Sequence, residues 1–533
     1  MPRLERWIAI MIALCAVVVS SIAFAEDGKT QTVQTQKTGQ VSGQVSGQVT
    51  GQVSGQVSGQ VSGQVSGQNS PRDSWFTVSI AGTKCGWMHE KFEVLGDRIQ
   101  TSNDIRLTLG RAGASTTVRV GWKFTESSDG TPIECEVQQE SGSEVSRTIY
   151  RFSKTEVAVD ETAGGRTLSR KMPSPEGIWW TPAQVERNIN ARRKDGATEI
   201  TYRTVDPSSG LRIVDMVSKR MGEGEAKKTI RWLTTNSAVP MPTEEDVDAD
   251  GDVIISRTKM AIGDMIARRC SESQAKQLSA TGGVDLIDRS MVSLAKPSPE
   301  LLTARHAKIA VRSTNGDALV FPASGAQRFE ANPAGGLFVD IDVGRTSLVT
   351  AEELADARYL ASSILIDAKD PAVIDLALRA VSSARLNETS PVADRAEALR
   401  AFVMRFIIHK DLATAFAGAS AVAQSKAGDC SEHAVLLAAL LRAQGIPSRV
   451  ASGMVYAEEF AGKRDVFAWH MWTQAQVDGA WIDLDATLSS RSFHPGHLLL
   501  ATSAQDDAQL DADFSNLLST MGNVSIEVVH VDR

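Results

Sequence analysis

Cysteine is scarce in this chain. Five cysteines occur among 533 residues, a density far below that of small secreted proteins that depend on disulfide bonds. Cys15 lies in an apolar segment near the N-terminus, which leaves Cys85, Cys135, Cys270 and Cys430 in the rest of the chain. A disulfide scaffold is therefore excluded, and the only pairing that we predict joins Cys85 to Cys135.

Basic clusters and long apolar runs are scarce as well. The net charge is −8, and lysine and arginine form no cluster of the kind that binds nucleic acid. Beyond the first 25 residues no stretch is long and apolar enough to cross a membrane. These absences exclude a nucleic-acid-binding protein and a protein with several membrane spans.

Residues 1–25 have the pattern of a secretory signal peptide. Arg3 and Arg6 precede an apolar run over residues 7–19, and Ala23-Phe24-Ala25 provides small residues for cleavage. We therefore predict an exported protein that is periplasmic, displayed on the cell surface or secreted. An uncleaved N-terminal anchor is the alternative, because the apolar segment is almost long enough to span a bilayer.

A tract of short repeats follows the signal segment. Residues 39–68 repeat Gly-Gln-Val-Ser with a period of four, varied only at Thr50. The frequent glycines raise the entropic cost of ordering the chain, and one valine per repeat cannot build a core. Residues 26–73 are therefore predicted to be a disordered linker, and a short solenoid is the alternative.

The region 74–297 is predicted to be a mainly antiparallel β domain. Alternating apolar and polar residues predict strands at 75–80, 117–122 and 199–204. Asp-Gly and Gly-Gly pairs mark turns between such runs, and one helix is expected near residues 182–193. An antiparallel meander fits this pattern.

One segment of this domain resembles half of a calcium-binding loop. Residues 246–251, Asp-Val-Asp-Ala-Asp-Gly, carry acidic side chains at the first, third and fifth positions. The twelfth position of such a loop is normally a bidentate glutamate, but here it is Arg257. We therefore predict a plain turn between two strands.

A β-rich segment, 298–349, connects this domain to the C-terminal region 350–533. Strand-like pieces occur in it at 308–311 and 337–341, but the sequence leaves open which neighbour they join. Helical patterns then begin at Thr350 and recur through residues 371–384 and 391–408. The whole chain is therefore predicted to be of the α+β class.

An apolar helix beginning at Cys430 is the central feature of the C-terminal region. Asp429 is its expected N-cap, Glu432 completes a capping box, and Gly445 ends the helix. Because it is apolar on nearly every side, it should be buried. A cysteine in its first turn feels the positive end of the helix dipole, which favours the thiolate.

A β-hairpin further along the chain brings a histidine toward an acidic residue. Asp478-Gly479 between alternating runs is a strong signal for a two-residue turn, in which Val477 pairs with Ala480. In that register His470 and Asp485 become diagonal neighbours on one face of the hairpin, ~7–8 Å apart at Cα. A thiolate, an imidazole and a carboxylate that orients the imidazole are the parts that cysteine nucleophiles use.

Other residues could fill the same roles. His433 lies one turn beyond Cys430 but is expected to pack or cap, Asp483 is a second candidate to orient the histidine, and Gln424 could donate to an oxyanion. Trp472 could cover the site or simply pack. His494 and His497 have the spacing of metal ligands, but Pro495-Gly496 between them indicates a turn, so no metal site is predicted there.

These motifs together resemble the bacterial transglutaminase-like superfamily. The resemblance covers about residues 350–490 and depends on four separate segments. They are Gly428-Asp429-Cys430 with Glu432-His433-Ala434, residues 445–449, His470-Met471-Trp472, and residues 481–487. It implies a papain-like core with Cys430 as nucleophile, His470 as general acid and base, and Asp485 as the group that orients it. The family often has Asp-Pro-Thr where this chain has Asp485-Ala486-Thr487, which leaves the aspartate in place.

The predicted function is that of an exported thiol enzyme. Cys430, His470 and Asp485 would act on amide or carboxamide bonds of proteins or peptides in the cell envelope through an acyl-enzyme. Hydrolysis is favoured over cross-linking, and no cofactor, metal or nucleic acid is expected. The alternatives are a catalytically degenerate binding or scaffold protein, and a zinc site made by Cys430, His470 and Asp485.

Overall fold

The computed structural model describes residues 71–532, without residues 112–113, 142–143, 164–165, 208–210, 238–240, 261, 278–283, 286–289, 317, 364, 410–416, 490–492 and 506–521. The predicted signal peptide and nearly all of the predicted linker lie outside the described residues. Within the described part of the chain, no helix is both long enough and apolar enough to pass through a bilayer.

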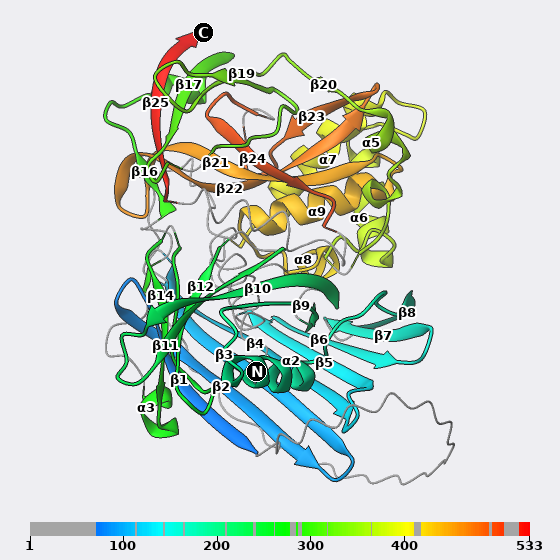
Figure 1. Ribbon diagram of the computed structural model, residues 1–533. Coiled ribbons are helices and arrows are strands. Elements are labelled where there is room, and N and C mark those ends of the chain that lie inside the picture. Colours follow the sequence, from blue (N-terminus) through cyan, green and yellow to red (C-terminus); the bar gives the residue numbers. More distant parts are fainter. Residues whose placement is uncertain are drawn as a thin grey trace.

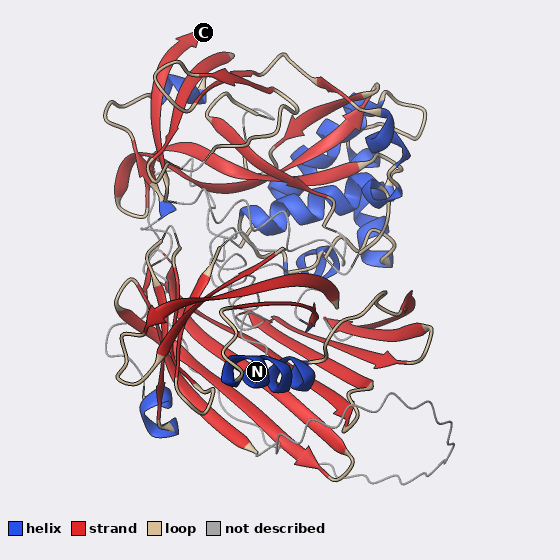
Figure 2. Cartoon of the chain, in the orientation of Figure 1, coloured by secondary structure: helices blue, strands red, loops and turns tan. Residues whose placement is uncertain are grey.

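The N-terminal region forms one large antiparallel sheet (Figures 1 and 2). A single short strand, β15 (Val284–Asp285), joins it in parallel, beside β3. The other strands are β1 (Arg72–Ile80), β2 (Thr83–Leu95), β3 (Arg98–Arg111), β4 (Ala114–Ser127), β5 (Pro132–Ser141), β6 (Glu144–Phe152), β7 (Glu156–Ala163), β8 (Arg166–Pro173), β9 (Glu199–Asp206), β10 (Arg212–Glu223), β11 (Ile230–Asn236), β12 (Thr243–Val247), β13 (Val253–Thr258) and β14 (Met265–Cys270).

The order of these strands is almost that of the sequence. Hairpins join β1 through β8 in one direction and β9 through β14 in the other, and β1 pairs with β14 where the two series meet. The predicted meander is therefore confirmed, although β1 begins at Arg72 rather than at Trp75. The calcium-like segment forms the β12–β13 hairpin, as predicted, and Arg257 donates to the carboxylate of Asp246.

The predicted helix of this region is α2 (Pro182–Lys194), which lies against the sheet (Figure 1). Its N-terminus meets a buried carboxylate of β4. The hydroxyl of Thr181 donates to Oε1 of Glu126 at 2.7 Å, and the backbone N–H of Ala183 donates to Oε2 at 3.1 Å. Glu126 therefore satisfies donors that a helix N-terminus leaves without intrahelical partners.

The stability of this region should depend on the charge of Glu126. Burial raises the pKa of Glu126 to about 7, and the bonds from Thr181 and Ala183 offset that rise only in part. An acid whose pKa is higher in the folded state than in the unfolded state binds more protons when folded, so stability falls as pH rises from ~4.5 to ~7. We expect a loss of up to about 3 kcal/mol across this range.

The pH dependence of urea unfolding can test this expectation. The difference in unfolding free energy between the native chain and Glu126→Gln should change steadily from pH 5 to pH 8, because the amide does not titrate. Parallel profiles for the two proteins would contradict it.

The disulfide that the sequence suggested is absent. Cys85 and Cys135 are both buried, and neither forms a disulfide bond. They lie on β2 and β5, which β3 and β4 separate. Three strand spacings amount to ~14 Å, whereas a disulfide needs Cα atoms within about 7 Å. The prediction was wrong because it depended on cysteine count without knowledge of strand order.

The C-terminal region combines helices with two further sheets (Figures 1 and 2). A short helix, α3 (Glu272–Lys276), follows β14 before this region begins. The helices of the C-terminal region are η2 (Pro299–Leu302), α5 (Ala351–Ala355), η3 (Ala357–Tyr359), α6 (Pro371–Ser383), α7 (Val392–Phe406), α8 (Ala419–Ser425) and α9 (Cys430–Ala443). Its strands are β16 (Val292–Ser293), β17 (His306–Ser313), β18 (Gln327–Ala331), β19 (Leu337–Asp342), β20 (Ser347–Leu348), β21 (Ser448–Phe460), β22 (Lys463–Val477), β23 (Ala480–Leu484), β24 (His497–Ser503) and β25 (Val524–Asp532).

The connecting segment is built into the C-terminal region, a point that the sequence left open. Strands β17, β18 and β19 form a four-stranded sheet with β25, from the far end of the chain. Strand β20 pairs with β23, and β16 pairs with β22. The sheet that contains the predicted catalytic histidine therefore draws strands from both sides of residue 350.

Helix α9 is the buried centre of the C-terminal region, as predicted. Every residue from Cys430 to Arg442 is buried. Helices α6, α7 and α8 contact it, and its other side packs on β21 and β22. The predicted α+β class is thus confirmed, with strands more abundant than helices.

Candidate active site

Cys430 occupies the first turn of α9, where local sequence fixes the start of the helix. The side chain of Asp429 accepts a hydrogen bond from the backbone N–H of Ser431 at 2.9 Å. The carboxylate of Glu432 accepts from the N–H of Asp429 at 2.9 Å and from the N–H of Ala417 at 3.0 Å. This is the predicted capping box, extended to a second segment of backbone.

Gly428 makes this helix start possible. Its φ of +154° is in the region that favours glycine, and a Cβ there would lie 2.3 Å from Cβ of Glu432. The glycine therefore lets Glu432 fold back beneath the capping residue. Cys430 is held with its side chain 0% exposed, at the positive end of the helix.

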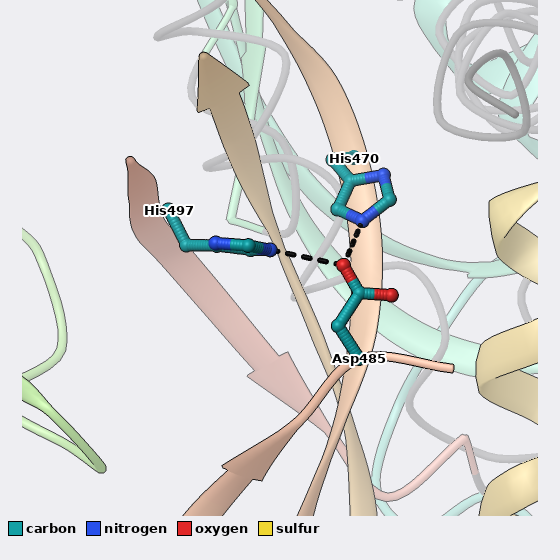
Figure 3. A group of neighbouring side chains, drawn as sticks. All are labelled: His470, Asp485 and His497. Carbon is teal, nitrogen blue, oxygen red and sulfur yellow. Dashed lines mark hydrogen bonds and ion pairs between the residues drawn. The ribbon is translucent and has the colours of Figure 1, made fainter. Parts of the chain in front are cut away.

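The predicted hairpin has the predicted register. Asp478 and Gly479 have φ of +49° and +78°, as a two-residue type I′ turn requires, and Val477 pairs with Ala480. His470 lies on β22 and Asp485 directly follows β23. Their side chains meet, with Nε2 of His470 2.7 Å from Oδ2 of Asp485 (Figure 3).

Asp485 is a fully engaged, buried carboxylate. Its Oδ1 accepts from the backbone N–H and the hydroxyl of Thr487, at 2.8 and 2.7 Å. Its Oδ2 accepts from His470 and from His497, at 2.7 and 3.0 Å. Burial alone would raise the pKa of Asp485, but the charge and hydrogen bonds of the two histidines outweigh it and hold the pKa well below its ordinary value. Asp485 is therefore an anion that fixes both rings.

His497 is the member of this cluster that the sequence analysis missed. It begins β24, which pairs with β21 rather than with β22. Strand β21 lies between the strands of the two histidines: its Gly453 pairs with His470 of β22 on one side and with Leu499 of β24 on the other. The ring of His497 reaches Asp485 across this strand. His494 and His497 have the spacing of metal ligands, but Pro495-Gly496 between them indicates only a turn. The missing signal was the pairing of β24, which local sequence does not encode.

The cysteine helix packs on the histidine strand. The hydroxyl of Thr473, on β22, donates to the backbone carbonyl of Ala434 at 3.0 Å, one turn beyond Cys430. Nε2 of His470 is held by Asp485, so proton exchange with a thiol would use Nδ1, which lies on the side of the ring away from the carboxylate (Figure 3). In a cysteine–histidine–carboxylate site, the carboxylate fixes the tautomer and the orientation of the imidazole in this way.

The competing residues have other roles. Asp483 accepts from Trp472 and Gln474 through Oδ1 and from the backbone of Ala326 through Oδ2, so it joins β22 to the connecting segment. His433 donates Nδ1–H to the carbonyl of Asp429 at 2.5 Å, within its own helix.

Trp472 and Gln424 are also accounted for. Trp472 is buried and its ring lies 6.2 Å from that of His470 and 5.2 Å from that of His497, so it packs beside the cluster. Gln424 is exposed on α8. A glutamine there is poorly suited to serve an oxyanion beside a buried thiol.

The cluster also has the composition of a metal site. Among the described residues, His470, Asp485 and His497 offer ligand atoms within 4.8 Å of one another. This set differs from the zinc site considered from the sequence, because it contains His497 instead of Cys430. The nitrogen–oxygen separations of 2.7 and 3.0 Å are those of direct hydrogen bonds to a charged acceptor. Hydrogen bonding therefore accounts for the geometry.

A family model covers the part of the chain that contains Cys430, His470 and Asp485. Residues 380–486 match the family model described as the transglutaminase-like superfamily. The chain carries a transglutaminase-like domain. The matched span runs from within α6 to the residue after Asp485, so it includes Cys430 and His470 and ends before His497. The resemblance found in the sequence is thus confirmed. No curated protein matches the chain.

Three solved structures show a low overall similarity to this chain. A β-barrel-like protein of a domain family of unknown function from Brucella abortus is 9% identical, covers 38% of this chain and 97% of its own, and has a TM-score of 0.30. "A Putative Cysteine Protease from Cytophaga hutchinsonii" is 18% identical, covers 43% and 87%, and has a TM-score of 0.24. A "putative protease" from Parabacteroides distasonis is 11% identical, covers 68% of each chain, and has a TM-score of 0.17. At these scores the likenesses carry no functional argument.

Proposed function

We propose that the protein is an exported thiol enzyme that acts on amide or carboxamide bonds of proteins or peptides. Cys430 would be the nucleophile, His470 the general acid and base, and Asp485 the group that fixes the ring of His470. The observation that carries this proposal is the 2.7 Å bond between His470 and an ionised, buried Asp485 beside a capped helix that begins with a cysteine. The predicted signal segment supports export to the cell envelope.

The reaction would proceed through a thioester. The thiolate of Cys430 attacks the carbonyl carbon of the amide, and the C–N bond breaks as Nδ1 of His470 gives its proton to the departing nitrogen. The neutral ring then takes a proton from water, which attacks the thioester and releases the acid and the thiol. A primary amine in place of water would give cross-linking instead.

Hydrolysis is the favoured outcome. Water is the abundant acceptor, and none of the described residues suggests an amine-binding site.

The proposed catalytic residues are buried. Cys430, His470 and Asp485 are each at most 1% exposed, so an acyl donor reaches the thiol only when neighbouring residues move. Such an opening step would precede acylation.

Selective alkylation of Cys430 is the first test. At pH 7, iodoacetamide should modify Cys430 at least tenfold faster than Cys85 or Cys270, because only the thiolate is nucleophilic. Burial raises the pKa of Cys85 to about 12 and also raises that of Cys270. Peptide mass spectrometry of the native chain would measure the rates, with the other thiols as internal controls. Modification of Cys430 no faster than that of Cys85 would support a degenerate scaffold protein instead.

The acceptor can be identified in the same preparation. The protein would be incubated with an unfolded protein substrate and a fluorescent primary amine, and the products analysed by mass spectrometry. New chain ends or glutamine-to-glutamate conversion would indicate hydrolysis, and the added mass of the amine would indicate cross-linking. If neither product forms although Cys430 is readily alkylated, the result would contradict amide chemistry.

A further inference from the structure

His497 lies in a position that the proposed chemistry does not yet explain. Its ring is 1% exposed, and both ring nitrogens meet oxygen atoms. Nδ1 lies 2.9 Å from the backbone carbonyl of His494, and Nε2 lies 3.0 Å from Oδ2 of Asp485. A carbonyl and an ionised carboxylate can only accept hydrogen bonds.

Two acceptors require two N–H groups on the ring. A neutral imidazole carries one proton, so one of its nitrogens would direct a lone pair at an oxygen in a buried site. Either choice of tautomer leaves a repulsive contact of about 3 Å inside the protein, which is costly at low dielectric. The doubly protonated ring satisfies both acceptors at once.

The surroundings of the ring fit a cation that faces an anion. The titratable groups beside it, among the described residues, are the carboxylate of Asp485 and the rings of His470 and His494, whose centroids lie 5.6 and 4.3 Å from its own. The other close rings are apolar, those of Trp472 and Phe493. Of the residues that the structure describes, Asp485 is the one acidic group in contact with it, and the pKa of Asp485 is held low partly by His497.

We infer that His497 is a positioning residue that binds Asp485 as a doubly protonated imidazolium and so neutralises the carboxylate that orients His470. This inference rests on the proposed thiol chemistry and adds a fourth member to its site. His497 acts through Asp485 and need not touch substrate. Its charge prevents Asp485 from over-stabilising the protonated form of His470, which must release its proton to the leaving nitrogen.

The pH dependence of turnover would reveal this charge. In His497→Gln the amide can still donate to Asp485, but the positive charge is gone. The protonated ring of His470 would then face an uncompensated carboxylate and lose its proton at higher pH. The alkaline limb of kcat/KM should therefore move up by about 1 pH unit, and the rate at the optimum should fall at least tenfold.

Phe493→Leu is the matched control. The ring of Phe493 packs 4.4 Å from that of His497 but carries no charge. This variant disturbs the packing around His497, so it should alter the rate without moving the alkaline limb. An equal movement of the limb in both variants, or none in His497→Gln, would overturn the inference.

Nuclear magnetic resonance provides a test that needs no activity. The chain has eight histidines, so selective ¹⁵N-histidine labelling gives few signals, and the pair that disappears in His497→Gln identifies this ring. Both nitrogens should carry protons at pH 7.5 in the native chain. A ring with one protonated nitrogen would overturn the inference, as would a signal that changes when a chelator removes bound zinc. If the chain proved inactive on every amide tested, this measurement would still decide the state of His497.

Discussion

Replacement of Cys430 by alanine should abolish amide turnover, and replacement of His470 by alanine should lower kcat/KM by about 10³-fold or more. Alanine at 430 removes the only atom that can form the thioester. Alanine at 470 removes both the base that activates water and the acid that protonates the leaving nitrogen. A 10³-fold loss corresponds to about 4 kcal/mol of transition-state stabilisation. Initial rates with a peptide amide, measured across substrate concentrations, would provide these values.

His433→Ala is the control for this prediction. His433 is also a buried histidine near Cys430, but it bonds to the backbone of its own helix. Its loss should reduce the thermal stability of the protein and change kcat/KM by less than tenfold. Equal losses in His433→Ala and His470→Ala would contradict the roles assigned here. Retained unfolding transitions in all three variants would show that the losses are chemical.

Gly453→Ala should be the most damaging single methyl addition near the site. A Cβ at this position would lie 2.0 Å from the backbone oxygen of Leu498 and 3.1 Å from the ring of Trp472. The first contact is with backbone of the neighbouring strand, so β21 and β24 would have to separate. We expect a loss of about 3 kcal/mol in stability, the upper end of what overpacking costs. The shift would also displace His497, which precedes Leu498.

Gly121→Ala provides a matched comparison. Gly121 also lies inside a strand, β4, but a Cβ there would meet nothing closer than 3.4 Å. Since alanine restricts the unfolded chain more than glycine does, this variant should be neutral or slightly more stable. Thermal and urea unfolding of both variants would measure the contrast. Equal transitions in Gly453→Ala and the native chain would refute the steric argument.

The sequence predicted the parts of the site that depend on local structure. Asp478-Gly479 has a backbone preference that fixes the turn, the turn fixes the register, and the register brings His470 to Asp485. The start of α9 followed in the same way from Asp429 and Glu432. These predictions succeeded because each depends on contacts within about 20 residues.

The parts that failed depend on pairings between distant strands. His497 joins the cluster only because β24 pairs with β21, with an irregularity in register between Ser452 and Gly453. The disulfide prediction failed because cysteine positions do not reveal that two strands separate β2 from β5. Turn chemistry and capping do not determine such pairings, since many strand orders bury the same residues.

Strand β25 has a consequence for how the protein is made. It pairs with β17, and His306 and Asp532 meet across a separation of 226 residues. Contacts so far apart along the chain form late, because a long loop must close before they contribute. During translation, the four-stranded sheet that contains β17 cannot be completed until β25 has left the ribosome. A chain that is exported unfolded would reach its compartment before this step is complete.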